Sequence, residues 1–560
     1  MRHRRASRIE ARHPVSHLRD RGVHAPDGDS RSRRKKPGHE KCRNAVAGKA
    51  RAVCEGAWPG DEGTAAGHRR RIRTKPLTLL QRLLAPAAAH QWASRLFVRG
   101  LALVYVAAFV SLGTQIAGLA GPDGILPLGA FLQRAYAIDG FVAWFRVPTL
   151  FWIDSSATAL QGAAFLGLVC ALLVAAGIGP QRLLLGTLFL LYLSLYQAGQ
   201  IFTSFQWDYL LLECGFLALF LVDTPTRLVV LLYHLLLFRL RFESGLFKLL
   251  SGDPSWRDFS ALDHYFETQP LPHIGAWYAH QLPEWLLRGG VGFTFATELV
   301  VPFFIFLPRP FRLVAAGTTI VAQLLIIATS NHNFINLLTI LLCLFLVDDR
   351  ALARLRRMRP MAAPAPLRVS GPLHATLLGG ATLLIVALSA AAIWTTLARR
   401  PAPAAVSALA AAAPAFGIGN VFHLFPTMQT ERQELRIFGS ADGTTWEEYE
   451  FRWKPGRPER APPFIVPHQP RLDWMMWFLP PQSPRTDYWF APLLQGLREN
   501  RPAVTRLFAR NPFAGRAPPV QLRVLAYRYR FTSPAEREAS GNWWKVELLG
   551  EYPDVSPRRP

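Results

Sequence analysis

The sequence predicts a polytopic α-helical membrane protein of about nine transmembrane helices that ends in a β-rich α+β soluble domain. Half of its 560 residues are hydrophobic. They lie in blocks of about 16–25 residues between short polar joints, which is the pattern of membrane helices. Arginine recurs in every second joint, as expected where successive helices alternate in direction. Beyond residue 416, apolar and polar residues alternate, which is typical of β-strands.

The N-terminal segment, residues 1–90, is strongly basic. Through residue 75 it holds 21 Lys and Arg against 8 Asp and Glu, which is +13 of the net charge of +25. It has no apolar period and no apolar core of a signal peptide, so we expect a disordered tail. Such a tail could bind acidic lipid or nucleic acid, or could be an over-long start of the reading frame. We favour the last explanation and expect no nucleic-acid partner.

The transmembrane domain is expected over 91–398. With the basic tail inside, the inner joints carry Arg182, Arg227 and Arg309, whereas the outer joints QAGQIFTSFQ and ATSNHNF carry no Lys or Arg. This bias orients the helices, and an odd number of spans places the C-terminus outside. The expected spans are approximately 95–119, 157–178, 182–200, 207–223, 227–250, 287–307, 311–330, 333–348 and 374–397.

The outside domain is expected over 416–555, after an Ala/Pro-rich linker at 399–415. The runs ELRIFGS and EYEFRW flank the residues ADG and predict a hairpin over about 433–453 that turns at Gly443. Two later runs, VQLRVLAYRYRFTS and NWWKVELL, have the same period of two. A helix is expected around 487–510. The Pro-rich middle is expected to be loop, because Pro withholds a ladder donor.

Polar side chains gather in the outer half of the predicted bundle. Residues 227–250 rise outward by 1.5 Å each, so Lys248 should lie near the surface and snorkel, with Arg241 about 10 Å below it. Arg239 and Glu243 form an i,i+4 pair. Charges at this depth are costly unless they are paired or line a cavity. The predicted cluster comprises Asp208, Glu213, Arg241, Glu243, Lys248, Asp253, Glu298, Asn331, His332 and Asn333.

Three interpretations of this cluster stay open. Arg241 pairs with Glu213 or Glu298 and locks the bundle, which we favour, or the residues line a cavity that binds or modifies a molecule from outside. A proton or ion path is the third. The five cysteines show no CxxC and no Cys/His cluster, so we expect neither a metal site nor a disulfide framework. No nucleophile–base pair is visible, so the catalytic residues are unknown and we expect no cofactor.

Five motifs in order resemble the lipase maturation factor family over about 90–555, as a bacterial-type member. They are QWDYLLLECGFLALFL, RFESGLFKLLSGDPSW, NHNFINLLTILLCLFLVDD, TERQELRIFGSADGTTWEEYEFRWKPG and PHQPRLDWMMWF. Eukaryotic members are endoplasmic-reticulum membrane proteins that help secreted lipases to fold. The resemblance therefore implies a chaperone-like role toward a secreted client, with membrane lipid around the helices. The Ala/Arg/Pro-rich composition suggests a bacterium, where the corresponding place is the inner membrane with the C-terminal domain in the periplasm.

Two functions follow from this. The first is a non-enzymatic maturation factor, which we expect, with Trp474, Trp477, Trp543 and Trp544 as candidates for client binding; burial in the core is the alternative for two or three of them. The second is an intramembrane enzyme, because the helical half is more distantly similar to vitamin K-dependent carboxylases. It would use Glu243, Lys248 and Asp253 at the outer mouth of a polar cavity.

Overall fold

The computed structural model describes residues 78–222, 224–356, 371–398, 400–480 and 488–552. The predicted basic tail lies outside the described residues up to residue 77. The described part begins with α2 (Leu79–Leu84), which Thr78 and Gln81 cap reciprocally. This short helix and the turn η1 (Ala88–His90) lie within the segment expected to be disordered.

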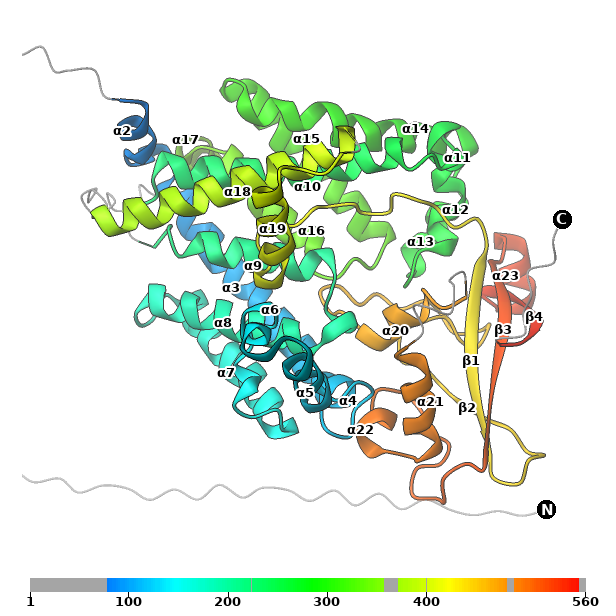
Figure 1. Ribbon diagram of the computed structural model, residues 1–560. Coiled ribbons are helices and arrows are strands. Elements are labelled where there is room, and N and C mark those ends of the chain that lie inside the picture. Colours follow the sequence, from blue (N-terminus) through cyan, green and yellow to red (C-terminus); the bar gives the residue numbers. More distant parts are fainter. Residues whose placement is uncertain (1–77, 223, 357–370, 399, 481–487, 553–560) are drawn as a thin grey trace, which may run out of the picture. The chain divides into compact units, whose positions relative to one another are not determined.

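The helical part forms most of the described chain (Figure 1). Its elements are α3 (Gln91–Gly113), α4 (Ile116–Ala120), α5 (Leu128–Asp139), α6 (Ala143–Arg146), α7 (Ala157–Ala176), α8 (Gln181–Ala198), α9 (Gln206–Ala218), α10 (Arg227–Leu250), α11 (Pro254–Arg257), α12 (Ala261–Thr268), α13 (Ile274–His280), α14 (Glu284–Phe295), the π-helix η5 (Ala296–Val300), η6 (Val301–Phe306), α15 (Arg309–Thr329), α16 (Ile335–Leu342), η7 (Cys343–Leu346), α17 (Asp349–Arg356), α18 (Pro372–Ala398) and α19 (Ala404–Ala412). The last of these lies in the predicted linker.

Five helical segments of the described chain are long and apolar enough to cross a membrane: 88–113, 157–176, 284–306, 309–329 and 372–398. The predicted count of about nine transmembrane helices is therefore not confirmed. Two of the other predicted spans are short, because α9 has 13 residues and α16 has 8. A third, α10, carries several charged side chains close together. The fourth is α8.

The shorter helices nevertheless run between the same two ends of the bundle as the long ones. At one end, Pro86 bridges to Thr226 ahead of α10, and Asp349 accepts the backbone N–H of Gln91 at the start of α3. At the other end, the joints after α8 and α15 contact the C-terminal domain, through Phe202 and Asn331. Since α9 and α16 lie between these joints along the chain, each connects one end to the other. The helix α10 begins at the first end, and its Lys248 near the other end binds Leu424 in the segment that leads to β1.

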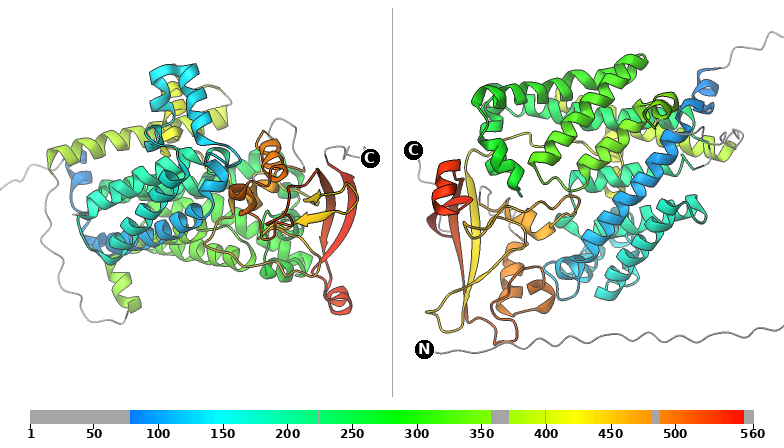
Figure 2. Two further views of the ribbon diagram at one scale, coloured as in Figure 1. Left: turned by 90° about the horizontal axis from the view of Figure 1, so that it is seen from below. Right: turned by 180° about the vertical axis from the view of Figure 1, so that it is seen from behind.

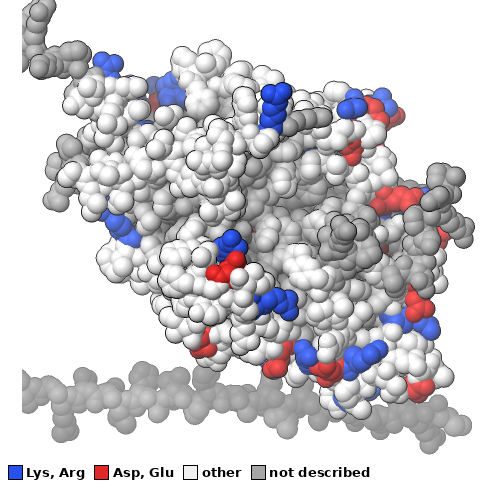
Figure 3. Space-filling model, viewed as in Figure 1, with Lys and Arg blue, Asp and Glu red and all other residues white. Residues whose placement is uncertain are grey.

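The helical surface is apolar. Phe165 on α7, Leu324 on α15 and Leu383 on α18 are all exposed, and the face in Figure 3 is mostly uncharged over the helices. Charged side chains on that face gather mainly toward the sheet. Exposed apolar surface of this extent marks contact with a membrane or a partner, and the helices provide it on several sides.

The C-terminal domain is a four-stranded antiparallel sheet with short helices, at one end of the helical part (Figure 2). The strands are β1 (Arg432–Ser440), β2 (Glu447–Tyr449), β3 (Gln521–Phe531) and β4 (Trp544–Glu551), in the order β2-β1-β3-β4. The helices are α20 (Arg471–Met476), α21 (Phe490–Arg498), α22 (Pro502–Thr505) and α23 (Pro534–Ser540). The expected helix near 487–510 is thus confirmed, as two short helices.

The hairpin prediction is also confirmed. Ile437 pairs with Tyr449 across β1 and β2, and Gly443 in the turn has φ of 77°, a conformation that favours glycine. The carboxylate of Asp442 accepts the backbone N–H groups of Thr444 and Thr445. These bonds hold the pKa of Asp442 well below its usual range, so the turn keeps a charged cap at neutral pH.

Candidate functional site

The predicted polar residues meet one extended segment, residues 417–430, which leads from α19 toward β1. The segment contains no helix or strand, so its backbone groups need partners elsewhere. Charged side chains of the helical part bind five of these groups, on Gly419, Asn420, Phe422, Leu424 and Met428. The buried charges of the bundle and the segment therefore satisfy each other's polar groups.

The first charge cluster joins α9 to α10. Arg239 Nη1 lies 2.6 Å from Oε1 of Glu213, and its Nε lies 3.8 Å from Oε1 of Glu243. The predicted i,i+4 pair is thus confirmed. The second oxygen of Glu213 accepts the N–H of Gly419 at 3.0 Å, and that of Glu243 accepts the N–H of Phe422 at 2.9 Å. One guanidinium and two carboxylates are therefore buried together and fixed to the segment.

The second charge cluster joins α10 to the π-helix η5. Glu298 binds two cations, with Oε2 at 2.8 Å from Nζ of Lys248 and Oε1 at 3.6 Å from Nη1 of Arg241. Gly245 permits the close approach of the two helices, because a Cβ there would lie 2.8 Å from Cβ of Glu298. This cluster carries one positive charge more than it carries negative.

The expectation that Lys248 snorkels to the surface is wrong. Its side chain is 4% exposed, and Nζ donates to Glu298 and to the carbonyl of Leu424, each at 2.8 Å. The segment 417–430 covers the end of α10 that depth alone places at the surface. Of the two carboxylates expected for Arg241, Glu298 is the partner, and Glu213 pairs with Arg239 instead.

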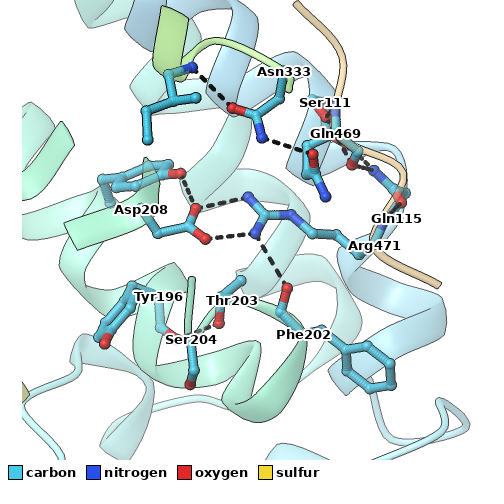
Figure 4. Close-up of polar contacts among 12 residues, drawn as sticks. Ser111, Gln115, Tyr196, Phe202, Thr203, Ser204, Asp208, Asn333, Gln469 and Arg471 are labelled. Atoms are coloured by element: carbon cyan, nitrogen blue, oxygen red, sulfur yellow. Dashed lines mark hydrogen bonds and ion pairs between the residues drawn. The ribbon is translucent and has the colours of Figure 1, made fainter. Parts of the chain in front are cut away.

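Asp208 has a partner that the sequence analysis did not single out (Figure 4). Arg471 at the start of α20 binds it twice, with Nη1 at 2.6 Å from Oδ2 and Nη2 at 2.7 Å from Oδ1. The hydroxyl of Tyr192 donates to Oδ1 at 2.6 Å, and Nη1 also donates to the carbonyl of Phe202. Both charged residues are fully buried. This bidentate pair fixes the C-terminal domain to the start of α9.

The joint after α15 holds a second C-terminal segment, residues 462–471. Asn331 donates to the carbonyl of Pro463 at 2.8 Å and accepts the N–H of Ile465 at 3.0 Å. Asn333 donates to the side-chain oxygen of Gln469 at 2.9 Å (Figure 4). The predicted cluster residues of this joint are thus interdomain contacts.

His332 and Asp253 complete the predicted cluster at separate places. The ring of His332 is hydrogen-bonded to the hydroxyl of Tyr265. Asp253 caps α11 through the N–H of Ser255, and its second oxygen accepts the N–H of Met428 at 2.8 Å. The structure therefore divides the predicted cluster among several contacts around the segments 417–430 and 462–471.

Burial sets the charge of side chains next to Arg471. It lowers the pKa of His468 to about 4, with a smaller contribution from Arg471 itself. Burial also raises the pKa of Asp473, although this carboxylate accepts the N–H groups of Trp453 and Lys454 at 2.7 and 3.0 Å. His468 is therefore neutral at pH 7 and adds no positive charge beside Arg471.

A groove of about 670 Å³ lies between the start of α9, the segment 417–430 and α20. We call it the aromatic groove, because its walls include Phe205, Trp207, Tyr209, Phe425, Trp474, Trp477 and Phe478. A smaller cavity of about 120 Å³, the inner cavity, shares Trp207, Leu424 and Phe425 with the groove. Arg241, Lys248 and Glu298 line the inner cavity.

The four tryptophans proposed for client binding fall into two pairs. Trp474 and Trp477 line the aromatic groove, where Trp474 is buried and Trp477 is half-buried. Trp543 and Trp544 are buried in a separate core with Tyr529. The second pair is therefore buried away from the groove, whereas Trp477 of the first pair lies where a ligand could reach it.

Of the three residues proposed for catalysis, only Lys248 lines the inner cavity. Each of Glu243, Lys248 and Asp253 is held by a different backbone group of the segment 417–430. Among the described residues, no group of three or more His, Cys, Asp and Glu could hold a metal ion. The described cysteines, Cys170, Cys214 and Cys343, are free and buried. Nothing in this geometry supports the enzymatic alternative.

Two family models match the chain. The model of the lipase maturation factor transmembrane domain matches residues 92–354, and that of the lipase maturation factor C-terminal domain matches 418–554. Lipase maturation factor 1 of Bos taurus is 34% identical over 505 residues, which cover 82% of this chain and 88% of the relative. Lipase maturation factor 2 of Gallus gallus is 34% identical over 589 residues, covering 83% and 81%. No solved structure matches the chain.

Proposed function

The chain belongs to the lipase maturation factor family, and on this basis we propose that it is a membrane-embedded factor that helps secreted lipases to fold. The observation that carries the proposal is that the matched segments, 92–354 and 418–554, include most of the helical part and the C-terminal domain. We further propose that the chain acts by binding its client and not as an enzyme.

The aromatic groove is the proposed client site. A partly folded lipase exposes apolar segments of varied sequence, and aromatic side chains bind such segments through large apolar faces. The groove combines these faces with accessible polar residues at its rim, such as His423 and Thr427. Trp477 and Phe478 are only half-buried there, so a client segment can reach them.

A charged side chain in the groove should impair maturation without affecting the fold. Thr427 lines the groove and is exposed, so Thr427→Arg introduces charge where an apolar client segment would bind. We expect the yield of active secreted lipase from co-expressing cells to fall about ten-fold, the effect of losing one strong contact. The measurement is the total lipase activity secreted into the medium per amount of cells.

The matched control is Thr444→Arg in the exposed hairpin turn, which should leave lipase yield unchanged. Both variants should accumulate like the wild type, as measured by blotting of the membrane fraction. Equal lipase yields for Thr427→Arg and the wild type would contradict the assignment of the groove to the client.

The proposed location is a bacterial inner membrane, with lipid around the helices and the C-terminal domain in the periplasm. The Arg-rich inner joints support this orientation. The shared ends of the short and long helices support nine membrane passes, in which α8, α9, α10 and α16 cross as well. Five and nine are both odd, so both counts place the two chain ends on opposite sides.

Reporter fusions test this topology. A reporter that is active only in the cytoplasm should be silent when fused after Pro560. Nine passes place residue 331 outside, because α16 and α18 both follow it, whereas five place it inside. The same reporter inserted after Asn331 should therefore also be silent. Activity at Pro560 would contradict the orientation, and activity at Asn331 alone would contradict nine passes.

A further inference from the structure

We propose that the inner cavity is a binding site for a small anionic amphiphile, a carboxylate with a short apolar chain, held by Arg241 and by indole and amide N–H groups. The site is separate from the aromatic groove, although the two share part of a wall. The proposal concerns a small ligand and goes beyond the proposed function, which concerns a protein client.

The charge of the cavity favours an anion. Arg241 and Lys248 face one carboxylate, Glu298, so the walls carry a net positive charge in a buried place. The other titratable groups in the walls are His332 and Tyr265, and protonation of His332 would only increase the excess. A buried charge without a counter-charge is costly, and an anionic ligand would supply one.

Several hydrogen-bond donors in the walls of the cavity lack an acceptor. Four N–H groups in its walls have no partner among the described residues: Nε of Arg241, Nε1 of Trp207, Nε1 of Trp256 and Nε2 of Gln323. One acceptor in the walls, Oδ1 of Asn336, also has no partner, so donors exceed acceptors by three. Each of these residues is at most 5% exposed. Buried donors are nearly always paired in folded proteins, so four in one cavity indicate a missing acceptor. A carboxylate has two oxygens and can accept several of them.

The rest of the cavity favours an apolar body. Leu240, Leu262, Ile326 and Ile335 contribute to its walls. Its volume of about 120 Å³ approaches that of cavities which bind benzene, about 150 Å³. A carboxylate with a few methylene groups fits this combination, and an inorganic anion would leave the apolar walls empty.

The geometry of the helices is also unusual at this point. Glu298 lies in the π-helix η5, and π-helical turns occur frequently at functional sites. Gly245 brings the opposite helix close to it. The two helices thus place a carboxylate between two cations, and leave the Nε of Arg241 unpaired.

Equilibrium dialysis with tritiated butanoate tests the proposal on the full chain in phosphatidylcholine nanodiscs, with empty nanodiscs subtracted. We expect saturable binding at one site per chain. Trp256→Phe removes an N–H that has no partner, so it should weaken binding about ten-fold and leave the melting temperature unchanged. Trp285→Phe, at a tryptophan 74% exposed, is the matched control and should bind like the wild type.

Two charge variants should change the affinity for the ligand in opposite directions. Arg241→Gln should weaken binding by more than Trp256→Phe does, because it removes a charged donor. Glu298→Gln should strengthen binding, because it removes the negative charge that competes with the ligand. If the charges of the cavity only hold the two helices together and bind no ligand, none of the variants should bind butanoate. If Glu298→Gln does not fold, Trp256→Phe still decides the question.

The following outcomes would overturn the proposal. They are absence of saturable butanoate binding, equal affinities for the wild type and Trp256→Phe, competition by inorganic phosphate as strong as that by butanoate, and competition by 1-butanol as strong as that by butanoate. The third would show that no apolar body is needed, and the fourth that no charge is needed. None of these assays contains a lipase, so failure here is distinct from failure of the proposed function.

Discussion

Replacement of Arg471 by methionine is expected to abolish most accumulation of the folded protein. The variant leaves the carboxylate of Asp208 fully buried without its bidentate partner. Breaking a buried pair from one side costs about 3–5 kcal/mol, a large share of a typical stability of about 5–15 kcal/mol. The measurement is the monodisperse fraction of a fluorescent fusion in detergent, compared at equal expression.

A second substitution should reverse part of this loss. Asp208→Asn removes the stranded charge, so the double variant should accumulate better than Arg471→Met alone. Arg530→Met, at an exposed arginine in β3, controls for the loss of an arginine side chain and should behave like the wild type. Normal accumulation of Arg471→Met would contradict a structural role for this pair.

Arg239→Met is expected to destabilise the protein more than Arg241→Met. Arg239 neutralises both Glu213 and Glu243, so its loss strands two buried carboxylates at a cost of about 3–5 kcal/mol or more. Loss of Arg241 leaves Glu298 with Lys248 at 2.8 Å, so that carboxylate keeps a counter-charge. The measurement is the melting temperature of each purified variant in one detergent.

The test is whether the melting temperature of Arg239→Met is lower than that of Arg241→Met. Glu213→Gln combined with Arg239→Met should recover part of the melting temperature, because it removes one of the two stranded charges. Equal melting temperatures for Arg239→Met and Arg241→Met, or the reverse order, would contradict the pairing of charges described above.

The positions of the helices could be predicted from the sequence because apolar blocks are long and continuous. The expected span 227–250 coincides with α10, and 157–178 differs from α7 by two residues at its end. The interruptions could not be predicted in this way. The expected span 287–307 contains a π-helix and a 3₁₀-helix that includes Pro302, and proline withholds a backbone donor that an α-helix needs.

The charged residues of the site could be found from the sequence, but their partners could not. Residue depth identified Arg241 and Glu298 as buried, because few charges interrupt the apolar blocks. The carboxylate of Glu243 binds a backbone N–H that lies 179 residues away, and a backbone group carries no signal in residue type. The burial of Lys248 could not be predicted for the same reason, because the segment 417–430 covers its side chain. Arg471 lies in a Pro- and Trp-rich run without a period, so its depth could not be assigned.

The contacts between the bundle and the segment 417–430 also fix an order in time. Glu213 and its backbone partner Gly419 are 206 residues apart, which the ribosome covers in about 10–40 s at roughly 5–20 residues per second. During this interval α9 and α10 have left the ribosome, but their buried charges lack the backbone partners found in the finished protein. The contacts of these charges are therefore completed only after the segment 417–430 has been synthesised. A nascent chain released before residue 419 would leave Glu213 without its backbone partner.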